Sequence, residues 1–242
     1  MLRRRRRRTL LWAALLLGAA LIGWDATHTR TLVPATLPVL PEHPPATTAP
    51  QVVERGAGTF GFSEVEGPVA GTAGPVLRYR IAVEDGVDLD VEEFGSIVEE
   101  VLSDPRSWTA SGMLRLQRVG SAGPYDFTVY LASPATSEQM CRADGLFTDR
   151  YTNCRLHDGR VVLNTDRWLN AVVDYGAPLA EYRAYAVNHE VGHQLGYGHE
   201  ACPGTGKPAP VMQQQTLGLA GCLPYGWPYR DGVRYTGPPT SG

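Results

Sequence analysis

Residues 189–199 read HEVGHQLGYGH, and they hold three of the six histidines in this chain of 242 residues. The segment before them predicts a helix from Leu179 to about Leu195, because Pro178 suits a first turn and Gly196 a left-handed C-terminal stop. On that helix His189 and His193 lie four residues apart, so both imidazoles project from one face. This spacing suits two ligands of one tetrahedral zinc ion.

Glu190 and His199 complete the set of chemically useful side chains in this segment. Glu190 is rotated about 100° around the helix from His189, so it faces a zinc-bound water rather than joining the ligands. Gly196 permits the positive φ that turns the chain back, which lets His199 supply a third nitrogen. Zinc would activate a water in the fourth position, and Glu190 would take its proton as general base.

The other three histidines lie outside this pattern. His28 and His43 fall in the N-terminal segments, and His157 sits beside a turn, where a surface position is expected. A single histidine is usually a satisfied structural residue, but three at ligand spacing around a glutamate indicate a metal site.

The pattern HExxHxxGxxH resembles the metzincin clan of zinc peptidases. The segment from Asn188 to Leu219 is also similar in sequence to a family of exported actinobacterial proteins that have a metzincin-like domain. The resemblance implies an α+β fold with a mixed, mostly five-stranded sheet, two main helices and an irregular C-terminal subdomain. It also implies a zinc-dependent endopeptidase whose substrate is a peptide or protein.

The same resemblance implies a Met-turn beneath the zinc, for which Met212 in the segment 208–212 is the candidate. The clan's tyrosine two residues after that methionine is replaced by Gln214, which excludes a tyrosine ligand there. Oxyanion support would then come from zinc itself, from residues 213–215, or from Tyr197 or Tyr225. The clan holds substrate along a sheet edge, for which residues 161–164 are the candidate; an ordinary hairpin arm is the open alternative for them.

Alternating and helical patterns of apolar residues predict the other strands and helices, and their order along the chain indicates an α+β fold. Strands are expected at 76–83, 114–119 and 127–132, and a hairpin at 153–157 and 161–164 around an Asp-Gly turn. Asp90 is expected to cap a helix reaching about Leu102, with Glu93 at the capping-box position.

The N-terminus carries targeting signals. Residues 1–30 combine an arginine run with a short apolar stretch, which predicts either a cleaved signal peptide or a retained signal anchor. Both place the bulk of the chain outside the cytoplasm, with a membrane contact if the segment is retained. Residues 31–50 are rich in Pro, Thr and Ala and predict a linker, so the peptidase domain is expected at 51–242.

Charge limits the partners of this domain. Residues 31–242 contain 15 basic and 24 acidic residues, which argues against a nucleic-acid partner. We expect a monomer.

Four cysteines, Cys141, Cys154, Cys202 and Cys222, predict two disulfides in an exported chain. Three pairings are possible, and sequence proximity favours Cys141–Cys154 and Cys202–Cys222. Cysteine ligation of zinc is disfavoured because no CxxC spacing occurs.

Two alternatives to a protein-cleaving enzyme stay open. The replaced Met-turn tyrosine also fits a catalytically silent, zinc-stabilised module that binds an envelope partner. A peptidase for peptidoglycan cross-links would use the same chemistry on another substrate.

Overall fold

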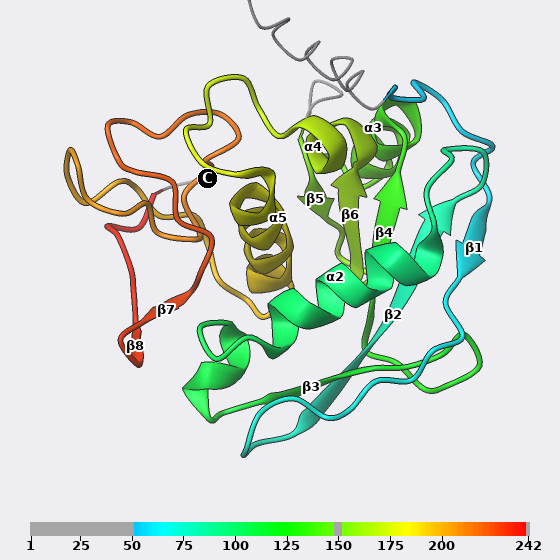
Figure 1. Ribbon diagram of the computed structural model, residues 1–242, viewed down its shortest axis with the longest axis horizontal. Coiled ribbons are helices and arrows are strands. Elements are labelled where there is room, and N and C mark those ends of the chain that lie inside the picture. Colours follow the sequence, from blue (N-terminus) through cyan, green and yellow to red (C-terminus); the bar gives the residue numbers. More distant parts are fainter. Residues whose placement is uncertain (1–50, 148–151, 241–242) are drawn as a thin grey trace, which may run out of the picture. The chain divides into compact units, whose positions relative to one another are not determined.

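A mixed sheet forms the centre of the domain (Figure 1). The computed structural model describes residues 51–147 and 152–240, all within one compact unit, Thr48–Gly242. The predicted signal segment (1–30) and linker (31–50) lie outside the described residues. No helix in the described ranges has both the length and the apolar character needed to span a membrane.

Six strands make up this sheet, in the order β1-β2-β4-β6-β5, with β3 also paired to β2. Strands β2, β3, β4 and β6 run parallel to one another, while β1 and β5 run antiparallel to their neighbours. Their bounds are β1 Phe60–Phe62, β2 Val76–Glu84, β3 Arg115–Arg118, β4 Phe127–Ala132, β5 Cys154–Arg155 and β6 Arg160–Asn164. The sheet therefore has one strand more than the mostly five-stranded sheet expected from the sequence.

The prediction that residues 161–164 lie at the sheet edge is wrong. Strand β6 pairs with β4 on one side and with β5 on the other. Val161, Val162 and Leu163 are all buried, as a continuous apolar run is in a strand covered on both faces. The edge strand is β5, the first arm of the predicted hairpin.

The described residues form four α-helices, of which α2 and α5 are the longest. Their bounds are α2 Val91–Ser103, α3 Pro134–Ala143, α4 Thr165–Asn170 and α5 Leu179–Gln194. A 3-10 turn spans Trp108–Ser111, and a short hairpin of β7 (Tyr229–Arg230) and β8 (Val233–Arg234) lies near the C-terminus. From Gly196 to this hairpin the chain has no further helix or strand, so the expected irregular C-terminal part is confirmed.

The two faces of the sheet build two separate hydrophobic clusters. Alternate residues such as Val129 and Leu131 of β4 pack in the main core, which includes residues of α2 and α5. Ala132, the next residue after Leu131, faces the other side and belongs to a smaller cluster with Cys141 of α3 and Cys154 of β5. This period of two explains why the strand pattern was visible in the sequence.

Local signals fix several boundaries as expected. Asp90 caps α2 by accepting hydrogen bonds from the backbone N–H groups of Glu92 and Glu93.

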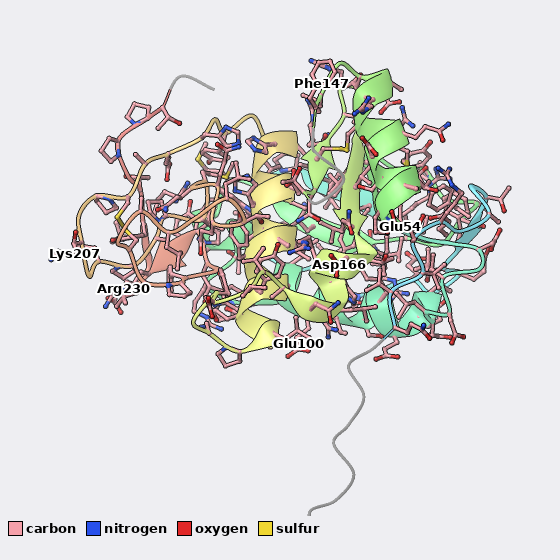
Figure 2. All side chains as sticks on the ribbon, turned by 90° about the horizontal axis from the view of Figure 1, so that it is seen from above. Glu54, Glu100, Phe147, Asp166, Lys207 and Arg230 are labelled. Carbon is pink, nitrogen blue, oxygen red and sulfur yellow. A yellow bond between two sulfur atoms is a disulfide. The ribbon has the colours of Figure 1, made fainter. Side chains whose placement is uncertain are left out.

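The disulfide pairing is also confirmed: Cys141–Cys154 ties α3 to β5, and Cys202–Cys222 cross-links the irregular half. Figure 2 shows that half from another side, with Lys207 and Arg230 at the end of the domain away from Glu54.

Candidate metal centre

Helix α5 carries the first half of the candidate site and is buried on almost every side. Ten of its sixteen residues are buried, including the unbroken run Ala184–Gly192. A helix surrounded by protein is not amphipathic, so a strong helical period is absent here. Its position is held partly by Asn188, whose side chain bonds Ser107 and the carbonyl of Gly226.

The structure brings His189, His193 and His199 together at the C-terminal end of this helix. The Nε2 atom of His193 lies 3.2 Å from that of His189 and 3.0 Å from that of His199. One ligand atom from each ring fits within 4.8 Å of the others, so the three could hold a metal ion. Gly196 has φ +92° and provides the expected reversal between His193 and His199.

Backbone carbonyls orient two of the three rings. His189 Nδ1 lies 2.8 Å from the oxygen of Val211, and His193 Nδ1 lies 2.9 Å from that of Tyr197. A carbonyl can only accept, so each Nδ1 carries the hydrogen and each Nε2 presents a lone pair to the cluster. Burial lowers the pKa of His189 to about 3 and also lowers the pKa of His193 and His199, which favours the neutral, ligating form.

The spacing of the nitrogens matches a tetrahedral metal centre. Zinc–nitrogen bonds of about 2.0–2.1 Å at tetrahedral angles separate two nitrogens by about 3.3 Å. The two separations from His193 Nε2, 3.2 and 3.0 Å, lie close to this value, and nitrogen lone pairs at such distances repel one another unless a cation lies between them. The donor set therefore fits a divalent ion that accepts imidazole ligands, which include zinc, copper, iron and nickel.

Glu190 lies beside these ligands on α5 and is almost completely buried. Desolvation by burial raises the pKa of its carboxyl to about 8. It does not belong to the group of residues that could hold the metal. Glu190 thus adds a buried acidic side chain next to His189 in the helix without being one of the candidate ligands.

Met212 packs against the helix from the irregular half of the domain. It is fully buried in a turn closed by a hydrogen bond from the Gln213 N–H to the Pro210 carbonyl, 2.9 Å long. A Cβ atom placed on Gly192 would lie 2.4 Å from the sulfur of Met212. Gly192, between the two helical histidines, is therefore what allows this methionine to approach so closely.

A second set of contacts holds the loop that carries His199. Glu200 forms an ion pair with Arg234 of β8 at 3.2 Å, and its backbone N–H donates to the Met212 carbonyl. The Tyr197 ring stacks on Trp108, with centroids 4.5 Å apart, and Arg234 lies over both rings. The C-terminal hairpin thus braces the third histidine.

Several residues named as candidate oxyanion donors are already engaged. Gln215 is buried, donates to the carbonyls of Pro210 and Tyr225, and accepts from the Tyr175 hydroxyl. The hydroxyl of Tyr225 donates to the Tyr229 carbonyl. Gln214 is exposed.

Arg155 of the edge strand is a residue that sequence reasoning missed. Its Nε atom donates to Oε1 of Gln194 at 2.9 Å, and Gln194 directly follows the ligand candidate His193. The positive charge of Arg155 contributes to lowering the His193 pKa, after burial. This contact spans 39 residues of sequence, so no local pattern signals it.

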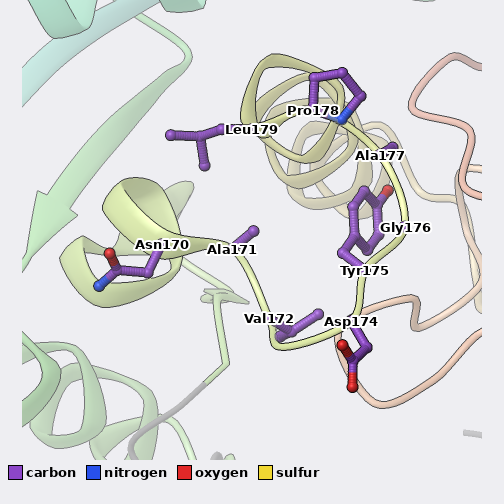
Figure 3. Close-up of a pocket in the computed structure, with 9 residues that line it drawn as sticks. All are labelled: Asn170, Ala171, Val172, Asp174, Tyr175, Gly176, Ala177, Pro178 and Leu179. Atoms are coloured by element: carbon purple, nitrogen blue, oxygen red, sulfur yellow. The ribbon is translucent and has the colours of Figure 1, made fainter. Parts of the chain in front are cut away.

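A separate cavity of about 580 Å³ lies in the loop between α4 and α5 (Figure 3). Residues 170–172 and 174–179 line it, and none of them is a candidate metal ligand. His157 is not part of the histidine cluster: it is exposed and pairs with Asp144. Within the part of the chain that the structure describes, the group of side chains that could hold a metal is the one at the end of α5.

Comparison with other proteins gives a family but no activity. No curated protein matches the chain, and no solved structure matches it. The model of one family, DUF3152, described as a protein of unknown function, matches residues 46–222. This range is most of the chain and includes the whole six-stranded sheet, α5 and the histidine cluster. The chain therefore belongs to the DUF3152 family.

Proposed function

We propose that this protein is an extracytoplasmic zinc-dependent endopeptidase with a metzincin-like fold. The observation that carries the proposal is the convergence of three imidazole rings, together with a buried glutamate, Glu190, that follows His189 in the helix and is not one of the candidate ligands. A purely structural zinc site is normally closed by four protein ligands, whereas three ligands leave a position for water or substrate.

Each residue of the cluster has a role in this chemistry. His189, His193 and His199 would hold the zinc ion, which supplies an activated water and polarises the scissile carbonyl. Glu190 accepts a proton from the water and passes it to the leaving amine. The Val211 carbonyl fixes the His189 ring through its bond to Nδ1, and Met212 packs against α5 at Gly192, between the two helical histidines.

The edge strand β5 supports binding of an extended peptide. The Leu156 N–H bonds the Arg160 carbonyl, so by the alternation of antiparallel ladders the next pair, Arg155 and Val161, is not hydrogen-bonded. The backbone N–H and C=O of Arg155 therefore point away from β6. A substrate strand can bond to them, as in other cases of strand addition.

Two features support an extracytoplasmic location. Both disulfides are typical of an oxidising compartment. The arginine run and apolar stretch in residues 1–30 form the layout of an export signal.

Replacing Glu190 by glutamine tests the mechanism. We expect Glu190→Gln to keep bound zinc but to lower peptide turnover at least about a hundredfold, because the proton acceptor is lost. Zinc content and hydrolysis of a peptide library should be measured on the full chain. Glu100→Gln, the same change at an exposed position of α2, is the matched control and should keep full activity.

The same library separates the proposal from its alternatives. Unchanged turnover in Glu190→Gln would refute the mechanism. No cleavage of any peptide by wild-type protein with zinc at full occupancy would favour a binding module. Cleavage confined to added peptidoglycan fragments would identify a cell-wall cross-link peptidase.

A further inference from the structure

The side chain of Arg155 lies on the face of the sheet that α5 covers. Its neighbour Cys154 points to the other face, where it is bonded to Cys141 of α3. Arg155 is paired with Val161, which belongs to the main core on the α5 side. The guanidinium thus reaches the end of the helix where the histidines converge.

Hydrogen bonding leaves part of this guanidinium available. The Nε–H is bound to Gln194, which fixes the orientation of the planar group. Among residues 51–147 and 152–240, no carboxylate lies within ion-pair distance of Arg155, although its strand neighbour Arg160 is paired with Asp158. The two Nη groups form a fork whose geometry matches a carboxylate.

We propose that Arg155 is a specificity-determining residue, which binds a carboxylate of the peptide substrate close to the scissile bond. The proposal rests on the proposed peptidase function and deepens it by naming the substrate class, peptides with an acidic side chain near the cleavage point. The domain is acidic outside its N-terminal segment, with 24 acidic and 15 basic residues in 31–242, so it would otherwise repel such peptides. The positive charge of Arg155 beside the candidate metal centre would instead attract the acidic side chain of the peptide.

Gln194 is the positioning residue in this arrangement. Its amide oxygen holds Arg155 through Nε, and because Gln194 lies on the same helix as His193, the fork is fixed relative to the metal ligands. A lysine at position 155 would keep the charge but would present one ammonium group instead of two parallel donors.

The test uses the full-length, zinc-loaded chain and pairs of fluorogenic peptides that differ only by Glu or Gln at one position near the scissile bond. We expect the wild type to have a kcat/KM at least about tenfold higher for the Glu member of one pair, mostly through KM. Arg155→Met should bring this ratio close to one, and Arg155→Lys should retain part of it. Arg160→Met removes the same charge on the adjacent strand and should keep the wild-type ratio.

Binding of the same peptide pairs to zinc-loaded Glu190→Gln protein, measured by fluorescence anisotropy, gives a readout that needs no turnover. If no peptide is cleaved but this protein binds the Glu member more tightly and loses that preference with Arg155→Met, the peptidase proposal fails and the carboxylate site stands. Equal ratios for wild type and Arg155→Met in both assays would overturn the site. A fall in melting temperature for Arg155→Met with an unchanged ratio would show that Arg155 only stabilises the end of α5.

Discussion

His199 is the ligand candidate that lies outside the helix, and its removal tests the metal centre directly. We expect His199→Ala to weaken zinc binding by more than about a hundredfold, because two imidazoles cannot complete the ligand set. Metal content after dialysis and competition with a chromogenic chelator measure the change. His157→Ala, at an exposed histidine paired with Asp144, is the matched control and should bind zinc as the wild type does.

Equal zinc affinity in the two histidine variants would contradict the proposed ligand set. Loss of zinc from both would indicate that His157 or overall folding, rather than the cluster, controls metal binding.

Gly192 is the second position where a single side chain decides the geometry of the site. A Cβ at this position would meet Met212 at 2.4 Å and Trp108 at 2.7 Å. We therefore expect Gly192→Ala to lower the free energy of unfolding by about 1–3 kcal/mol, the usual cost of overpacking a core. Chemical denaturation measures it.

Gly198→Ala is the control for this prediction, because a Cβ at Gly198 meets no atom within 4 Å. It should change stability far less than Gly192→Ala does. A Gly192→Ala protein as stable as the wild type would show that Met212 is not packed tightly against the helix.

Strands and helices with a regular pattern could be predicted from the sequence. Strand β2 follows the expected alternation from Val76, and α2 begins after the expected Asp90 cap. Helix α3 was missed because it is short and buries polar residues such as Thr136 and Ser137, which hides its apolar face. Amphipathic periodicity identifies only helices whose buried side is apolar.

The place of a strand within the sheet could not be predicted in the same way. The apolar run of β6 was recognised as a strand paired with β5 in a hairpin, but its second neighbour, β4, is set by tertiary pairing. Arg155 was missed for a related reason, since its partner Gln194 is distant in sequence. By contrast, the histidines and Met212 could be predicted because one short segment of sequence holds them all.

The disulfide Cys141–Cys154 links the edge strand to α3, so its removal should act on that edge. We expect the double variant Cys141→Ala/Cys154→Ala to be less stable by about 3 kcal/mol, the chain-entropy value for a loop of this length. Amide hydrogen exchange should rise more in β5 than in β1, which pairs with β2 at the far side of the sheet. Equal exchange in both strands would show that the disulfide does not hold the edge.

The candidate metal centre lies where the sheet with its helices meets the irregular C-terminal part of the domain. Helix α5 packs against the sheet, and the irregular C-terminal half supplies His199, Met212 and the bracing Arg234. Between them lies a cluster of buried tyrosines, Tyr175, Tyr182 and Tyr185, whose rings contact one another and, through Tyr185, the ring of His189. The stability of the domain therefore depends on keeping these hydroxyls neutral.

Burial raises the pKa of Tyr182 to about 12 and also raises the pKa of Tyr175 and Tyr185. The folded pKa of Tyr182 exceeds the unfolded value of about 10, so the unfolded chain releases this proton at a lower pH than the folded protein does. The contribution of the neutral, buried hydroxyl to the free energy of unfolding is therefore complete below pH about 10 and is lost as the pH rises through about 12. We expect the loss to be about 2–3 kcal/mol for Tyr182 alone, measured by urea unfolding across this range.

The chain has a single lysine, Lys207, and both cysteine pairs are disulfides, so tyrosines dominate this alkaline transition. Tyr182→Phe should start less stable, since it loses the bond to Thr216, but should show a shallower decline with pH; an unchanged slope would exclude Tyr182 as its source.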